Sequence, residues 1–115
     1  MKRLDEADLP EDVRTELDGM VAVILRECDP ELVILFGSWA RGEAGKRSDF
    51  DFVIVADTPD SHVLSGRLYG ELGTEERDVD VLVVSPDYWE HWKQVPGLVL
   101  YRANREGVVL HERAA

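Results

Sequence analysis

The sequence has little of what marks a secreted or a membrane-bound protein. Cys28 is its only cysteine, so an internal disulfide is excluded, and no apolar run approaches the roughly 20 residues of a membrane span. Residues 1–6 lack the apolar stretch of a signal peptide. We therefore expect a cytoplasmic protein without a membrane partner, folded as one domain over residues 1–115.

Positive charge is also scarce. The 13 Lys and Arg residues are outnumbered by 24 Asp and Glu residues, which gives a formal net charge of −11. Binding to DNA or RNA needs a basic surface for the phosphate backbone, so direct nucleic-acid binding is not expected. A nucleotide would have to be held by a metal ion and by local cations. Arg41, Lys46 and Arg47 cluster in one segment, and we interpret Lys46 and Arg47 as part of a solvated loop.

Apolar residues recur with both helical and strand periods along the chain. The expected helices cover about residues 10–28, 39–43, 58–72, 85–94 and 98–105, and the expected strands cover 31–36, 49–55, 78–84 and 108–110. The first three strands are the main ones, so we predict an α/β (or α+β) fold with helices on a small mixed sheet. Residues 1–8 are expected to be frayed. Thr58 is expected to cap the helix that Pro59 opens.

Gly37 and Ser38 follow the first predicted strand directly and open a short helix. Glycine lets the backbone approach another group closely, and Ser38 offers both a hydroxyl and a backbone N–H. Helix starts bind phosphate, because their free N–H groups and the helix dipole favour an anion. This turn therefore predicts a phosphate contact.

Two acids open the next predicted strand. Asp49 and Asp51 are two residues apart, so on a strand their side chains leave the same face, about 7 Å apart at the backbone. Phe50 and Phe52 alternate with them and are expected to face the core. An acid pair of this kind suits hard divalent cations, which prefer oxygen ligands. A solvated strand end remains the alternative.

A third acid begins the predicted strand over residues 78–84. Either Asp78 or Asp80 would join Asp49 and Asp51 if the two strands lie side by side. Three carboxylates on adjacent strands can hold two metal ions about 4 Å apart, the arrangement used for in-line nucleotidyl transfer.

The combined motif resembles that of a known enzyme superfamily. Gly37-Ser38-x-Ala40-Arg41-Gly42, followed by Ser48-Asp49-x-Asp51, is similar to the signature of polymerase-β-type nucleotidyltransferases, and in particular of their minimal nucleotidyltransferase (MNT) branch. The resemblance implies a nucleotidyltransferase fold and favours Asp80 as the third acid. It implies that Asp49, Asp51 and Asp80 are catalytic and bind two Mg²⁺ ions. ATP would be bound by the residues of the turn, the short helix and the loop, namely Gly37, Ser38, Arg41 and Ser48. Arg41 is interpreted either as a phosphate contact or as an ion-pair anchor of the loop.

The same resemblance implies a partner. Minimal nucleotidyltransferases commonly act as antitoxins of a helical HEPN-domain toxin, by binding it, by adding AMP to one of its hydroxyl groups, or by both. We expect Mg²⁺-dependent transfer of AMP from ATP to a hydroxyl of such a protein. Two alternatives stay open: a catalytically silent antitoxin that acts by binding, and a nucleotidyltransferase that modifies a small molecule of the aminoglycoside type.

Aromatic and aliphatic residues are dense near the end of the chain, at Tyr88, Trp89, Trp92, Leu98, Leu100 and Tyr101. They form either a second face of the core or a partner surface, since Trp and Tyr are favoured at the centres of interfaces.

Overall fold

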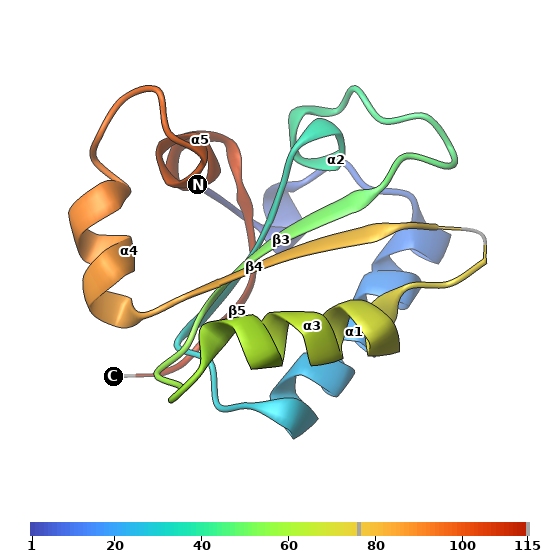
Figure 1. The fold of residues 1–115 in the computed structure, drawn as a ribbon. Helices are drawn as coiled ribbons and strands as arrows, with labels where there is room; N and C mark the ends of the chain where they lie inside the picture. Colours follow the sequence, from blue (N-terminus) through green and yellow to red (C-terminus); the bar gives the residue numbers. More distant parts are fainter. Residues whose placement is uncertain (76, 115) are drawn as a thin grey trace.

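Two layers of helices enclose a five-stranded sheet in the computed structural model, which describes residues 1–75 and 77–114 (Figure 1). The strands are β1 (Lys2–Arg3), β2 (Leu32–Phe36), β3 (Phe50–Val55), β4 (Val79–Val84) and β5 (Val108–Glu112). The helices are η1 (Leu4–Glu6, a 3-10 turn), α1 (Glu11–Glu27), α2 (Ser38–Arg41), α3 (Ser61–Leu72), α4 (Pro86–Trp92) and α5 (Val99–Glu106). In the part of the chain that the structure describes, no helix combines the length and hydropathy needed to cross a membrane.

The strand order is β1-β5-β2-β3-β4, with β2 antiparallel to both β5 and β3, and with β3 parallel to β4. The predicted fold class, a mixed sheet with helices packed on it, is confirmed. The sheet is wider than the three main strands predicted. The last strand extends to Glu112 and pairs with the central β2, and its Val108 and Leu110 pack on the main core.

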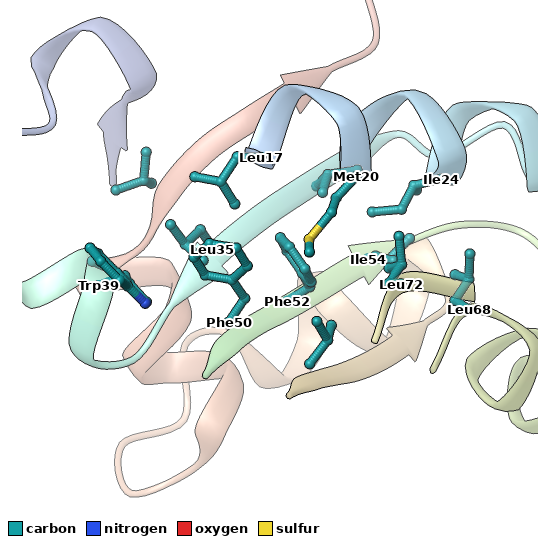
Figure 2. Close-up of a cluster of buried hydrophobic side chains, with 14 of the residues drawn as sticks. Leu17, Met20, Ile24, Leu35, Trp39, Phe50, Phe52, Ile54, Leu68 and Leu72 are labelled. Carbon is teal, nitrogen blue, oxygen red and sulfur yellow. The ribbon is translucent and has the colours of Figure 1, made fainter. Parts of the chain in front are cut away.

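The alternation predicted for β3 divides its side chains between two cores. Phe50, Phe52 and Ile54 are fully buried among side chains of α1 and α3, as Figure 2 shows. Val53 and Val55 point to the opposite face and pack with α4 and α5. A strand that is buried on both faces reads as a nearly continuous apolar run, and only the acids at its start interrupt that run.

The aromatic and aliphatic residues near the end of the chain divide between the second core and the surface. Trp89 and Leu100 are buried in the core under α4 and α5. Tyr88 and Leu98 are 52% and 39% exposed and lie on the surface of the same region. The second core therefore has an apolar exterior.

Two local predictions were wrong. Residues 1–8 are not frayed, because Lys2 and Arg3 pair with β5 and Ala7 is buried in the main core. Helix α3 begins at Ser61, where Asp60 is the cap and accepts hydrogen bonds from the N–H groups of its second and third residues at 3.0 and 3.2 Å. The carboxylate of Asp60 is a stronger acceptor than the Thr58 hydroxyl, which explains the later start.

Candidate functional site

The Gly37 turn meets the first acid-bearing strand because β2 and β3 are antiparallel. Their register pairs Phe36 with Asp51, so the residue that leaves β2 lies at the beginning of β3. Gly37 has a φ of 79°, and a Cβ added to it would overlap Oδ2 of the Asp51 carboxylate. Only glycine fits both the backbone angle and this close approach. The predicted turn and the predicted acid are thus in direct contact.

The third acid reaches the same place through the parallel pairing of β3 and β4. The register sets Asp80 directly beside Asp51. Asp78 precedes β4, and its backbone carbonyl accepts a hydrogen bond from the Phe50 N–H at 3.1 Å. Of the two acids left open by the sequence, Asp80 is therefore the one on the strand, in register with Asp51.

The electrostatics of Asp51 reflect this crowding. Burial, followed by the negative charges of Asp80 and Asp49, raises the pKa of Asp51 from 3.8 to about 6, while the positive charge of Arg41 acts in the opposite sense. Like charges that share a small site disfavour each other's ionised form. The negative charges of the three acids therefore repel one another, and a cation bound between them would relieve this repulsion.

The three acids are chemically suited to a hard divalent cation, because every ligand atom they offer is a carboxylate oxygen. Asp49 and Asp80 are exposed and Asp51 is half-buried, so the donors are accessible from solvent. Within residues 1–75 and 77–114, no three His, Cys, Asp or Glu side chains converge into a metal-binding group.

Arg41 lies at the end of α2, within electrostatic reach of Asp51. Its guanidinium pairs with Glu43 at 3.0 Å and with Glu106 of α5 at 3.7 Å. These contacts match the interpretation of Arg41 as an ion-pair anchor. They hold its positive charge at the edge of the acid cluster.

Ser48 orders the loop that precedes Asp49. Its hydroxyl accepts a hydrogen bond from the Gly45 N–H at 2.8 Å, and its carbonyl accepts one from the Trp39 indole N–H at 2.9 Å. The loop is thereby tied to α2 on one side and leads into β3 on the other. Lys46 and Arg47 are exposed on this loop, as expected.

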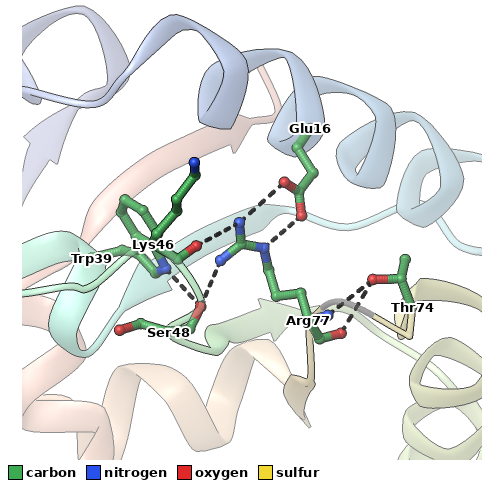
Figure 3. A network of polar contacts seen from close by, with 6 residues as sticks. All are labelled: Glu16, Trp39, Lys46, Ser48, Thr74 and Arg77. Atoms are coloured by element: carbon green, nitrogen blue, oxygen red, sulfur yellow. Dashed lines mark hydrogen bonds and ion pairs between the residues drawn. The ribbon is translucent and has the colours of Figure 1, made fainter.

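Arg77 is the residue that sequence reasoning missed. Its side chain is only 10% exposed and forms a two-pronged ion pair with Glu16 of α1, at 2.6 and 3.2 Å (Figure 3). It also donates to the carbonyls of Ser48 at 2.6 Å and Lys46 at 3.4 Å. The guanidinium lies over the Phe50 ring at 4.3 Å. These contacts fix the loop that leads into Asp49.

No signal in the sequence points to this role. Arg77 stands in a predicted turn among other charged residues, and its partners lie 29 and 61 positions away along the chain. Only the folded arrangement of α1, the loop and β4 brings these groups together.

Comparisons with known proteins agree with this geometry. A family model described as "Polymerase beta, Nucleotidyltransferase" matches residues 21–114. A candidate nucleotidyltransferase from Sulfolobus solfataricus has a TM-score of 0.58 at 17% identity, with coverage of 86% of this chain and 79% of that chain. A chain in a crystal structure of a toxin–antitoxin with AMP-PNP has a TM-score of 0.57 at 21% identity, and the match covers 83% of this chain and 73% of that chain. At these identities the likeness shows the fold. No curated protein matches the chain.

Proposed function

The chain belongs to the polymerase-β-type nucleotidyltransferase family, and from that premise we propose that it transfers AMP from ATP to a hydroxyl group of a partner protein. The observation that carries the proposal is the close contact of three motif elements. The Gly37 backbone lies against Asp51, and Asp51 lies in register with Asp80. A phosphate-binding turn beside clustered carboxylates is the arrangement that nucleotidyl transfer requires.

Asp49, Asp51 and Asp80 would hold two Mg²⁺ ions, which neutralise charge on the triphosphate and lower the pKa of the acceptor hydroxyl. The acceptor oxygen attacks the α-phosphorus of ATP, the bond from that phosphorus to the α–β bridging oxygen breaks, and pyrophosphate leaves. Asp80 would take the hydroxyl proton, and its exposure to solvent beside Asp51 supports this role.

The turn and the cations around it would bind the phosphates of ATP. The backbone of Gly37, which lies against Asp51, and the start of α2 at Ser38 would supply free N–H groups for this contact. Arg41 adds a positive charge that Glu43 and Glu106 already orient. Ser48 contributes by ordering the loop that delivers Asp49.

The proposed partner is a toxin of the HEPN-domain type. Two lines support it: the motif resembles that of minimal nucleotidyltransferases, and the fold is similar to a chain of a toxin–antitoxin structure. The cognate toxin would present a serine, threonine or tyrosine hydroxyl as acceptor.

The test is AMP transfer measured by intact mass, with the protein encoded beside this one as acceptor. Wild-type chain, labelled ATP and Mg²⁺ should add one or more AMP units to the partner. Asp49→Asn should abolish the addition and leave folding unchanged, because Asp49 is exposed and outside the strand. Asp18→Asn, an exposed acid on α1, serves as the matched control and should act as wild type. Undiminished transfer by Asp49→Asn would refute the proposed site.

A second candidate is an antitoxin that neutralises its partner by binding alone. The apolar exterior around Tyr88 and Leu98 favours it, because such a surface is suited to a protein partner. Neutralisation by a variant that lacks Asp49, Asp51 and Asp80, together with the absence of AMP transfer by the wild type, would establish this second function.

A further inference from the structure

A cavity of about 500 Å³ opens between the start of α3, the end of β4 and the helices α4 and α5. Its apolar wall includes Leu82, Tyr88, Leu98 and Val99, which are 39–52% exposed. Among the described residues that line it there is no aspartate, glutamate, lysine or arginine. Small-molecule sites commonly have volumes of roughly 300–1,000 Å³ and mostly apolar walls with a few polar groups. The cavity therefore suits an uncharged group of the size of a small ligand.

The cavity lies on the same face of the sheet as the acid cluster. Side chains alternate along β3, so Asp51 leaves the face of Val53, which packs with α4 and α5 (Figure 1). On β4, Asp80 and Leu82 are two residues apart and also share a face, about 7 Å apart at the backbone. Because Leu82 lines the cavity, the acids and the cavity are neighbours along β4.

This arrangement agrees with the dimensions of a nucleotide. When the α-phosphate of a nucleotide lies at the acids, the ribose carries the base away from the phosphorus by a distance similar to that between Asp80 and Leu82. A base over Leu82 would leave the triphosphate at the acid cluster and at the turn of Gly37. The anionic part of the ligand would then lie at the metal ions proposed for the acids, and its uncharged part would lie in the uncharged cavity.

Aromatic side chains give the cavity a surface on which a base can stack. Tyr88 and Trp92 both line it, and their ring centroids lie 6.0 Å apart. Every base has a π-face, so stacking on an aromatic ring depends little on the identity of the base. Thr58 and Ser61 add two hydroxyl groups near the start of α3, which can hydrogen-bond to the edge of a base.

We propose that this cavity binds the base of the nucleotide, with Tyr88 as the main stacking surface and Leu82 beneath the ribose. The lining offers more apolar surface than hydrogen-bonding groups, so it selects a base by ring size more than by the groups on its edge. A purine covers more of the apolar wall than a pyrimidine and is therefore bound more tightly. This inference rests on the proposed function, since it assigns the base subsite of the same reaction.

A second cavity, of about 720 Å³, is less suited to the base. It opens between α1 and the loop over residues 44–48, and charged side chains line it, among them Glu16 and Arg77. Arg77 lies over the ring of Phe50, which belongs to the main core, so this cavity is on the side of the sheet opposite to Asp51. A base held there would draw the triphosphate away from the acids.

The experiment measures binding of MgATP, MgCTP and magnesium tripolyphosphate by isothermal titration calorimetry, without an acceptor protein. Tripolyphosphate keeps the three phosphates and lacks the ribose and the base. Tyr88→Ala is compared with Tyr69→Ala, a helical tyrosine of similar exposure (58%) outside the cavity. Leu82→Ala, at a second exposed position of the wall, is an independent variant of the cavity. Circular dichroism and thermal melting verify that the variants are folded.

Wild type should bind MgATP several-fold more tightly than MgCTP, and tripolyphosphate more weakly than either. Tyr88→Ala should weaken MgATP binding roughly tenfold and leave tripolyphosphate binding unchanged. Leu82→Ala should act in the same direction, and Tyr69→Ala should bind all three ligands as wild type does.

Wild type that binds MgATP no better than tripolyphosphate, or MgATP affinity that Tyr88→Ala and Leu82→Ala leave unchanged, would overturn the proposal. Equal weakening of MgATP and tripolyphosphate by Tyr88→Ala would overturn it as well, since the effect would then be on the phosphates. Loss of partner binding by Tyr88→Ala, with MgATP affinity unchanged, would overturn it in favour of a protein-docking surface.

The full reaction separates this inference from the proposed function. AMP transfer to the partner that Tyr88→Ala leaves intact, with an unchanged KM for ATP, would refute the base site and leave the enzyme standing. Base-dependent binding of MgATP by wild type, without any AMP transfer to the partner, would support the base site and refute the proposed transfer.

Discussion

At the scale of single residues, Gly37 determines how close the turn over residues 37–38 can come to the acids. Its φ of 79° lies in a region that side chains rarely adopt, and the space that a Cβ would need is occupied by the Asp51 carboxylate. The turn residue was predictable from its type and position. Its contact with the Asp51 carboxylate was not predictable, because that contact depends on the register of β2 and β3.

Gly37→Ala should destabilise the fold by about 1–3 kcal/mol and displace the Asp51 side chain. The cost combines an unfavourable φ with an overlap that only movement of the carboxylate can remove. Urea unfolding measures the loss. Gly66→Ala is the control: no atom lies within 4 Å of its added Cβ, so this helical change should stabilise by up to about 1 kcal/mol. Equal effects of the two substitutions would contradict the close approach at Gly37.

Asp51 predicts a pH dependence of stability. Its pKa in the folded protein, about 6, lies above its ordinary 3.8, so the folded state binds the proton more tightly than the unfolded state. The resulting stabilisation is fully present below pH 3.8 and is lost as pH rises through 6.

Asp51→Asn should therefore raise the free energy of unfolding at pH 7.5 in magnesium-free buffer, by roughly 1 kcal/mol after allowance for solvent screening. The gain over wild type should vanish near pH 4, where Asp51 is protonated. Urea titrations at the two pH values measure it. A variant that is less stable than wild type at pH 7.5 would show that the carboxylate is not repelled by its neighbours.

At the scale of elements, Arg77 joins helix α1, the loop over residues 44–48 and the start of β3. Removal of its guanidinium would leave the Glu16 carboxylate and the Ser48 carbonyl without their donor. Arg77→Met keeps much of the apolar packing on Phe50 and removes these bonds.

Arg77→Met should lower the free energy of unfolding by about 2–3 kcal/mol, because partly buried acceptors lose their charged donor. Arg26→Met is the matched control. Its pair with Glu27 is 4.0 Å long and its side chain is 69% exposed, so its loss should cost less than about 0.5 kcal/mol. Thermal and urea unfolding give both values. Similar losses for the two arginines would show that the Arg77 network does not stabilise the fold.

The elements themselves were largely predictable from sequence. The start of α4 was correct because Ser85 caps it and Pro86 suits its first turn. The pairing between strands was harder to predict from sequence. The pattern of β5 indicates a short terminal strand, yet β5 pairs with the central β2. The contacts of Arg77 were also hard to predict, because its partners are distant in sequence. Local pattern specifies an element, and tertiary contact decides its neighbours.

At the scale of the whole molecule, the site depends on the topology of the sheet. An antiparallel pairing returns Gly37 to the start of β3, and a parallel pairing starts β4 beside it. Residues from three segments therefore meet at one end of two adjacent strands. Local pattern supplied Asp49 and Asp51 and left Asp78 and Asp80 open as the third acid, with the family resemblance in favour of Asp80. The register makes Asp80 the neighbour of Asp51.

Ligand binding should be visible in the stability of the whole protein. ATP and Mg²⁺ together should raise the melting temperature, because a ligand that binds only the folded state stabilises it by mass action. ATP with EDTA should give little or no shift, since the acids would then repel the triphosphate. Differential scanning fluorimetry measures the three conditions. A shift of equal size in EDTA would mean that the acid cluster does not bind the nucleotide through a metal.

The most direct test of the account compares two neighbouring acids, Asp80 and Asp78, in the AMP-transfer reaction. Single-turnover incorporation of AMP into the partner is followed by intact mass for wild type, Asp80→Asn and Asp78→Asn. Asp80→Asn should lose at least about 10²-fold in rate, because its carboxylate lies in register with Asp51 and is the one proposed to bind metal and accept the proton. Asp78→Asn should stay within a few fold of wild type. Loss of activity in Asp78→Asn, with Asp80→Asn active, would contradict the site described by the structure.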